Sequence, residues 1–235
     1  MSPLKFQEQM QYFRENNYTA IRLSQAIDFI RSKKRFGERE FVITFDDGYR
    51  SVYTECFPVL RQYGFPATVF LVTDYCGRYN NWPGQLSSLR RLPLLSWNEI
   101  SEMNRWKFDF GAHTAAHPDL TRVPIERARR QIVSSKARIE DFLGSAVQLF
   151  SYPYGKGNAQ LKEMVEEEFQ GACSTKLAKA TLHSDVYFLE RIDMYYLSAF
   201  FTGPSTAVAD WYLALRKFLR ESRDIFKRKR AKASW

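Results

Sequence analysis

The sequence predicts an α/β protein in which helices surround a parallel sheet or barrel. Short apolar runs typical of buried strands alternate along the chain with longer segments whose apolar residues recur at helical spacing. Polar clusters follow three of the predicted strands, where parallel α/β folds carry their chemistry. The chain has 235 residues, 45% of them hydrophobic and 26% charged, which suffices for one globular domain with its own core.

The expected elements follow one another in a regular order after two initial helices within residues 6–30. Strands are expected at residues 41–45, 67–72, 108–111, 147–152, 171–174 and 188–194. Helices are expected at residues 51–63, 124–143 and 159–169, and one more begins at Ser96, where the sequence Ser-Trp-Asn-Glu forms a capping-box pattern. Residues 73–92 form a long loop, and loops of that length in compact domains are commonly functional.

Cysteine content and hydropathy indicate the cellular compartment. The three cysteines, Cys56, Cys76 and Cys173, are too few and too scattered for a disulfide framework or a Cys-rich zinc module, so they are expected to be buried thiols in a reducing compartment. No apolar run approaches the ~18 residues of a membrane span, and residues 1–20 lack the core of a signal peptide. We therefore expect a cytoplasmic protein, with membrane association or a trimmed secreted precursor as alternatives.

Basic residues concentrate near the C-terminus. Residues 216–232 hold nine lysines and arginines and two acids, a surplus of seven out of the net charge of +9. The remaining chain is nearly neutral, which argues against a nucleic-acid partner, because nucleic-acid-binding folds carry basic residues across a folded face. Residues 206–235 are expected to form an amphipathic basic helix and tail that contacts a membrane peripherally. A barrel-closing helix with a solvated basic end is the alternative.

Asp46 and Asp47 form the first polar cluster. They follow the apolar run at residues 41–45 and precede Gly48, which can adopt a positive φ. This position delivers both carboxylates to the mouth of the sheet. An Asx-turn or a cap that leads into the next helix is the alternative interpretation.

His113 and His117 form the second cluster and are two of the three histidines in the chain. Their spacing predicts that both imidazoles lie on one face of a helical turn. Two histidines and one carboxylate leave a zinc ion one open position for water, which is the arrangement of a catalytic site rather than a structural one. A pair of polar histidines at a strand-to-helix junction is the alternative.

The third cluster is the sequence Phe-Ser-Tyr-Pro-Tyr-Gly at residues 150–155, which predicts a rigid turn at the same edge of the sheet. Taken alone, it is equally compatible with a plain turn. The long loop adds Tyr75, Tyr79 and Trp82, whose rings suit contact with sugars. Packing of these aromatic rings against the barrel is the alternative.

Together the three clusters resemble the polysaccharide deacetylase (NodB-homology) family. The family's Thr-Phe-Asp-Asp-Gly motif is unaltered at residues 44–48, and its His-Ser/Thr-x-x-His motif is matched at residues 113–117. One branch of the family has the motif Phe-Ala/Ser-Tyr-Pro-Tyr-Gly, which is matched at residues 150–155. The resemblance covers about residues 4–197. It implies an irregular (β/α) barrel with about seven units and a single catalytic domain at residues 1–205.

The resemblance also implies roles for individual residues. Asp47, His113 and His117 match the family's metal triad and would hold one divalent ion, with Zn²⁺ expected first. Asp46 matches the general base, which would take a proton from a water molecule that the ion makes more acidic. Tyr154 matches the residue whose backbone N–H helps to stabilise the oxyanion.

Three features of the family are altered or missing here. Many members carry an arginine two residues before the proline of the third motif, paired with the base, and this chain has Ser151 there. Arg191 is a candidate replacement, with a surface ion pair as the alternative. The late Leu-x-His motif that supplies the general acid is not cleanly present, although His183 is a weak match. Without His183, the proton would come from Asp46 or from solvent. A fourth motif, with Asp and Trp, is not recognisable.

The sequence thus predicts a metal-dependent amidohydrolase that acts on C–N bonds other than peptide bonds. Its expected reaction is removal of N-acetyl groups from an amino-sugar polysaccharide or a glycoconjugate such as a sugar-lipid, with release of acetate. One alternative is hydrolysis of another C–N bond or of an O-acetyl ester at the same site. A catalytically decayed glycan-binding module is the other.

Overall fold

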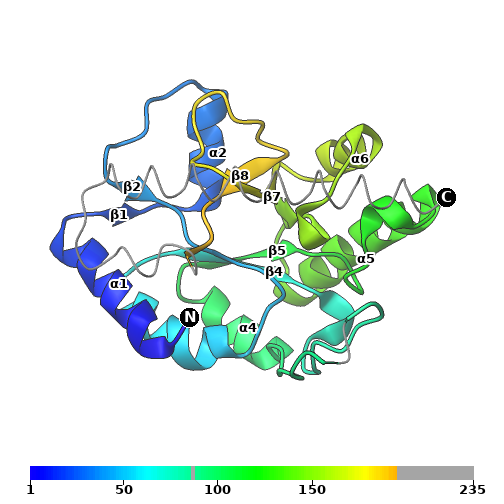
Figure 1. Ribbon diagram of the computed structural model, residues 1–235, viewed down its shortest axis with the longest axis horizontal. Helices are drawn as coiled ribbons and strands as arrows, with labels where there is room; N and C mark the ends of the chain where they lie inside the picture. Colours follow the sequence, from blue (N-terminus) through cyan, green and yellow to red (C-terminus); the bar gives the residue numbers. More distant parts are fainter. Residues whose placement is uncertain (86–87, 195–235) are drawn as a thin grey trace.

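The computed structural model describes residues 1–85 and 88–194, and the predicted tail at residues 206–235 lies outside them. At its centre is a six-stranded sheet in which all strands run parallel and each strand neighbours the next one along the chain. Helices lie around these strands (Figure 1). The sheet curls into an incomplete barrel, and this arrangement confirms the predicted α/β fold.

The strands are short. Those of the sheet are β3 (Thr44–Phe45), β4 (Ala67–Leu71), β5 (Phe108–Ala112), β6 (Leu149–Ser151), β7 (Gly171–Leu177) and β8 (Leu189–Arg191). A separate parallel pair consists of β1 (Thr19–Ala20) and β2 (Glu40–Phe41). The single strand predicted at residues 41–45 is therefore divided, because β2 pairs with β1 whereas β3 pairs with β4.

The helices begin and end where local sequence signals place them. They are α1 (Pro3–Glu15), α2 (Leu23–Arg31), α3 (Phe57–Tyr63), α4 (Trp97–Asn104), α5 (Ile125–Leu143) and α6 (Ala159–Glu168). Ser96 and Glu99 form the expected capping box of α4. Gly64 and Gly144 end α3 and α5 in left-handed conformations. None of the helices in the described part of the chain is long and apolar enough to cross a membrane.

The helix predicted at residues 51–63 has two parts. A π-helical turn, Val52–Cys56, precedes α3. Pro58 lies at the start of α3, and because proline has no N–H it cannot donate to the carbonyl of Thr54, as an uninterrupted α-helix would require. The proline therefore gives a reason for the irregular hydrogen bonding at this junction.

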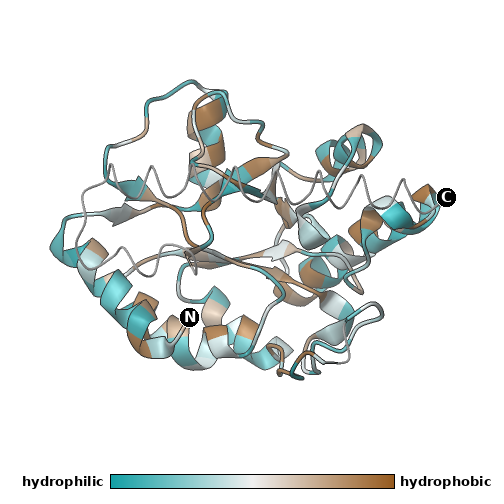
Figure 2. Cartoon of the chain, viewed as in Figure 1, coloured by the Kyte–Doolittle hydropathy of each residue, from teal (hydrophilic) through white to brown (hydrophobic). Residues whose placement is uncertain are grey.

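The core lies between the sheet and its surrounding helices. All five residues of β4 are buried, as expected for a parallel strand covered on both faces. The largest apolar cluster joins strand residues such as Val69 and Phe150 to helix residues such as Leu60 and Ile132. Brown, hydrophobic stretches lie along the central strands and on parts of the surrounding helices (Figure 2). This packing fixes the strand ends that carry the polar clusters.

Gly111 on β5 tests how tightly this core is packed. A Cβ atom at Gly111 would lie 2.5 Å from Phe70 Cδ1 and 2.8 Å from the backbone oxygen of Leu149. We expect Gly111→Ala to lower the free energy of unfolding by about 1–3 kcal/mol, measured by urea denaturation, because overpacking forces the neighbouring backbone to move. In the control Gly37→Ala, the new Cβ would meet only the flexible Glu40 side chain. Equal stability of the two variants would contradict the expectation.

Candidate active site

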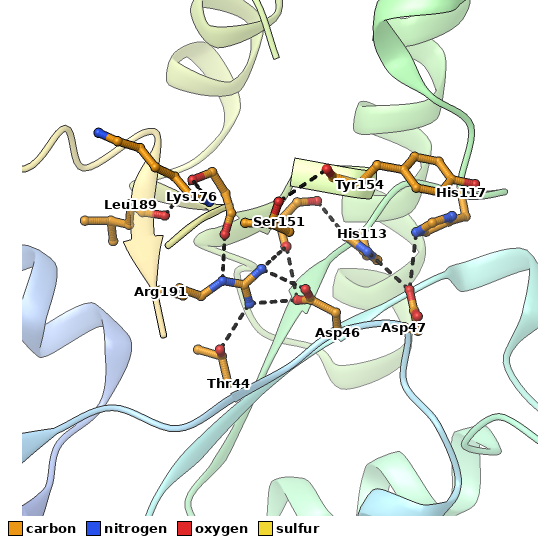
Figure 3. Close-up of polar contacts among 12 residues, drawn as sticks. Thr44, Asp46, Asp47, His113, His117, Ser151, Tyr154, Lys176, Leu189 and Arg191 are labelled. Carbon is orange, nitrogen blue, oxygen red and sulfur yellow. Dashed lines mark hydrogen bonds and ion pairs between the residues drawn. The ribbon is translucent and has the colours of Figure 1, made fainter. Parts of the chain in front are cut away.

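Asp47, His113 and His117 converge at the carboxyl ends of β3 and β5. One ligand atom from each residue lies within 4.8 Å of the others. Asp47 Oδ1 is 3.3 Å from the Nε2 atoms of both histidines (Figure 3). The histidines are 2% and 5% exposed, and Asp47 is half-buried. The three residues therefore form a candidate site for a divalent metal ion.

The two histidines do not lie on a helical turn, so that part of the sequence prediction is wrong. They belong to the loop after β5, in which Thr114 has φ 67° and His117 has φ 54°. Thr114 Oγ1 accepts a hydrogen bond from the backbone N–H of His117 at 3.0 Å and closes the loop. With Thr114 and His117 in left-handed conformations, the centroids of the two imidazole rings lie 4.9 Å apart. The same spacing of four residues thus produces convergence without a helix.

The orientation of His113 suits a metal ligand. Its Nδ1 atom lies 2.7 Å from the backbone carbonyl oxygen of Ser151. A carbonyl oxygen can only accept, so Nδ1 carries the hydrogen and, in the neutral ring, the lone pair of Nε2 faces Asp47. Burial and the charge of His113 together lower the pKa of His117 to about 4, so His117 is neutral near pH 7, as metal ligation requires.

The local field also favours a cation. Burial alone would lower the pKa of His113, but its hydrogen bond to Asp47 and the charges of Asp46 and Asp47 raise that pKa above its ordinary value. The negative field that favours a proton on His113 favours a metal ion in the same way. Two imidazole nitrogens and one carboxylate oxygen form a donor set that fits several divalent transition-metal ions.

Asp46 is held by Arg191, which lies on β8. The Arg191 Nη1 and Nη2 atoms donate to Oδ1 and Oδ2 of Asp46 at 2.9 and 2.7 Å, which is a bidentate ion pair. The guanidinium also donates to Thr44 Oγ1, to Ser151 Oγ and to the backbone oxygen of Ser174. All three nitrogens are therefore engaged, and the arginine is fixed in one position.

The charge state of Asp46 follows from these contacts. Burial would raise its pKa, but the charge of Arg191, the charge of His113 and hydrogen bonds from Arg191 and Ser151 lower the pKa to about 2. Ser151 Oγ donates to Asp46 Oδ1 at 3.1 Å. Asp46 is therefore an ionised, oriented carboxylate directly beside the candidate metal ligands.

Aromatic rings enclose His117 at the edge of the site. The Tyr154 ring lies 4.7 Å from the His117 ring, and the Trp82 ring lies 4.6 Å from it. Tyr154 has φ 59° in the turn after β6, and burial raises the pKa of its phenol, with Asp47 raising it further and Trp82 opposing the shift. Trp82 is 3% exposed and also packs against Tyr75, so it is part of the wall of the site rather than an open sugar platform.

Comparison with known proteins places this geometry in a family. The family model described as polysaccharide deacetylase matches residues 33–168, which is more than half of the chain. The chain belongs to the polysaccharide deacetylase family. The resemblance carried by the three sequence motifs is thereby confirmed.

The curated relatives of this chain are distant. The chain is 27% identical over 198 residues to a poly-β-1,6-N-acetyl-D-glucosamine N-deacetylase of Staphylococcus epidermidis, covering 80% of this chain and 65% of that protein. It is 25% identical over 181 residues to the protein of the same name from Escherichia coli strain K12, covering 64% of this chain and 27% of that protein. The chain spans less than two thirds of the curated relatives it matches first.

Two solved structures share the fold of this chain. The Streptococcus pyogenes deacetylase PplD, in complex with acetate, aligns with a TM-score of 0.71 at 20% identity and covers 81% of this chain and 80% of that chain. IcaB from Ammonifex degensii aligns with a TM-score of 0.70 at 22% identity, over 86% of this chain and 90% of that chain. At these identities the likeness establishes the fold.

The structure gives different results for the two motifs in which this chain departs from the family. Arg191 lies where the sequence suggested a replacement for the motif arginine, because it is paired with Asp46 while Ser151 contributes only a hydroxyl. His183 is exposed in the β7–β8 connection, where its backbone N–H donates to Thr181 Oγ1. No contact joins His183 to the described residues of the site, so nothing in the structure supports its use as the general acid.

We expect the purified protein to hold about one divalent ion per chain, and His117→Ala to weaken ion binding by more than about 100-fold. Mutation of a residue that hydrogen-bonds to a metal ligand typically lowers metal affinity about 10–100-fold, and loss of a ligand itself should lower the affinity at least as much. Elemental analysis and competition with a chelator measure this. His183→Ala is the matched control, because His183 lies outside the site. Equal metal content in the two variants would argue against the proposed ligand set.

Removal of Arg191 should destabilise the metal-free protein in a pH-dependent way. Arg191→Met leaves the Asp46 carboxylate without its partner, and we expect a loss of about 1–3 kcal/mol in the free energy of unfolding at pH 7. Because the folded-state pKa of Asp46 is lowered to about 2, the stability that the pair contributes is fully present above the ordinary pKa of 3.8 and is lost as the pH falls through 2.

Urea denaturation between pH 2 and pH 7, with chelator present, measures the difference between the Arg191→Met variant and the wild type. Arg129→Met removes an exposed ion pair with Glu167 and should change stability little at any of these pH values. A difference for Arg191→Met that does not shrink at low pH would show that the ion pair is not its source.

Proposed function

We propose that this protein is a zinc-dependent deacetylase that hydrolyses N-acetyl groups of an amino-sugar polysaccharide. Asp47, His113 and His117 would hold the ion, and Asp46 would act as the general base. The observation that carries the proposal is the placement of an ionised, immobilised Asp46 beside three residues with the donor set of a catalytic zinc site. Family membership and relatives named as poly-β-1,6-N-acetyl-D-glucosamine N-deacetylases support the choice of substrate.

A bound Zn²⁺ would polarise the acetamide carbonyl and lower the pKa of a water molecule at the site. Asp46 would accept one proton from that water as its oxygen adds to the carbonyl carbon. A carboxylate with a pKa of about 2 is a weak base, so Asp46 depends on water that has been made more acidic by the adjacent cation. Arg191 keeps the Asp46 carboxylate in a single orientation during this transfer.

Tyr154 would help to stabilise the negative charge that develops on the carbonyl oxygen, through its backbone N–H. Its left-handed conformation and its ring contact with His117 place it at the edge of the site. When the C–N bond breaks, the amine needs one proton, which the protonated Asp46 or solvent can return. The products are acetate and a free amine on the sugar, and Asp46 ends the cycle ionised.

Three expectations still rest on the sequence alone. Contact with a membrane was predicted for residues 206–235, which lie outside the described residues. The cytoplasmic location and the use of a sugar-lipid substrate are likewise proposals without a structural test. The intact geometry of Asp46, Asp47 and the two histidines favours an enzyme over a decayed glycan-binding module.

Asp46→Asn should separate metal binding from catalysis. An amide cannot accept the proton, so we expect acetate release from β-1,6-linked N-acetylglucosamine oligomers to fall by about 100-fold or more, while the metal content stays near one per chain. The rate of acetate release is measured with a coupled enzymatic assay. Asp141→Asn, an exposed change on α5, is the control.

Two results would contradict the proposed activity. Undiminished turnover of Asp46→Asn would remove Asp46 from the reaction. Hydrolysis of simple acetyl esters with no acetate from the oligomers would favour the esterase alternative.

A further inference from the structure

An ion pair joins two of the loops that form the edge of the candidate site. Lys156 Nζ lies 2.5 Å from Asp119 Oδ2 and donates a hydrogen bond to it. Asp119 follows His117 in the loop after β5, and Lys156 follows Tyr154 in the loop after β6. The pair therefore connects the loop that carries a candidate metal ligand to the loop that carries the proposed oxyanion donor.

The Asp119 carboxylate is held in place by its own loop. Its Oδ1 atom accepts hydrogen bonds from Thr121 Oγ1 at 2.6 Å and from the Thr121 N–H at 3.2 Å, so Asp119 caps the short 3₁₀ turn Leu120–Arg122. The other oxygen, Oδ2, binds Lys156. Arg122 Nε lies 3.5 Å from the same oxygen, but it belongs to the same loop and is 80% exposed. Lys156 is therefore the partner through which this carboxylate reaches the neighbouring loop.

The loop after β6 is held on its other side by β7. Gly155 has φ 64°, and a Cβ atom there would lie 2.1 Å from Thr175 Oγ1, so the backbone of this turn packs directly against β7. Thr175 Oγ1 donates a hydrogen bond to the backbone oxygen of Tyr154 at 3.4 Å. The Lys156 ammonium extends from this turn and lies 5.7 Å from the centroid of the Tyr154 ring. It thus ties a loop that rests on β7 to the loop after β5.

We propose that the Asp119–Lys156 ion pair positions the Tyr154 backbone N–H relative to His117 and the ion that His117 would hold. This inference rests on the proposed function. A hydrogen-bond donor stabilises an oxyanion only where the charge develops, so a small displacement of one loop against the other slows the reaction. Asp119 and Lys156 are positioning residues, because they act through Tyr154 and His117 and do not take part in the chemical step.

Lys156→Met removes the ammonium and keeps much of the apolar side chain. We expect kcat for β-1,6-linked N-acetylglucosamine oligomers to fall about 10-fold, which is less than the roughly 10²–10³-fold cost of losing an oxyanion donor entirely. KM should stay within about twofold, because the pair acts on the transition state rather than on the bound substrate. The metal content should stay near that of the wild type.

Lys162→Met is the matched control for Lys156→Met. It removes an ion pair of the same length, 2.5 Å to Asp185, which joins α6 to the β7–β8 connection rather than two loops of the site. Its kcat should match that of the wild type. A loss of kcat as large as that of Lys156→Met would show a general effect of removing a partly exposed lysine and would overturn the inference.

Binding of a transition-state analogue separates positioning from stability. A sugar with a methylphosphonyl group in place of the reacting acetyl group presents a tetrahedral oxyanion, and its binding is measured by isothermal titration calorimetry. Its dissociation constant should rise about 10-fold in Lys156→Met, in parallel with the loss of kcat, while binding of the deacetylated oligomer stays within about twofold. A lower Tm with unaltered kcat and analogue binding would leave the pair a role in stability only.

The inference and the proposed function fail in different ways. Unchanged kcat and analogue affinity in Lys156→Met, beside an active wild type, would overturn the inference alone. Absence of acetate release by the wild type would end the proposed function and this inference with it.

Asp119→Asn tests the other end of the pair. An asparagine oxygen can still accept from Thr121 and keep the capped turn, but it carries no charge for Lys156. If the two residues act through one ion pair, the combined Asp119→Asn and Lys156→Met variant will lose no more turnover than the larger single change. Losses that multiply to about 100-fold would show that the two side chains act independently and would overturn the inference.

Discussion

The ion pair between Arg191 and Asp46 joins the two ends of the curled sheet. Arg191 belongs to β8, the last strand, and Asp46 directly follows β3, the first strand of that sheet. The guanidinium also bonds Thr44 on β3 and the backbone of Ser174 on β7. Among the described residues no backbone pairing joins β8 to β3, and side chains connect these two edges of the sheet. The same contacts hold the Asp46 carboxylate beside the candidate ligands.

The order of the strands explains why residues distant in sequence share one site. Because each strand lies next to its successor and all are parallel, every strand delivers its following loop to the same rim. Asp47 follows β3, His113 follows β5, and Tyr154 follows β6. The buried core below fixes the strand ends, so the polar side chains can be packed closely without rearrangement of the backbone.

Much of this architecture could be predicted from the chain alone. The alternation of apolar runs and helical segments gave the parallel α/β fold, and the residues of the three motifs do meet in space. Arg191 was recognised as a candidate because it lies on a late strand that can reach the rim. The general-acid role suggested for His183 finds no support in the structure. A single histidine outside a recognisable motif does not indicate where its loop lies relative to the site.

The errors have local physical causes. A spacing of four residues suits a helical turn, but two left-handed residues between β5 and the next element, Thr114 and His117, bring the rings together equally well. An apolar run does not reveal which strand it pairs with, so the division at residues 41–45 was not visible. The burial of the Trp82 ring against Tyr75 and His117 depends on tertiary packing, so the sequence could not decide between a packed ring and one that is open to a sugar.

Four residues around the candidate site, Asp47, Thr114, His117 and Tyr154, adopt positive φ although none is glycine. Each such conformation costs on the order of 1 kcal/mol relative to the common regions, and more for a β-branched residue such as Thr114. The surrounding framework therefore holds the rim in a shape that the free peptide would leave. An ion held by Asp47, His113 and His117 would join two of these loops, so the supply of that ion would affect how stable this end of the molecule is.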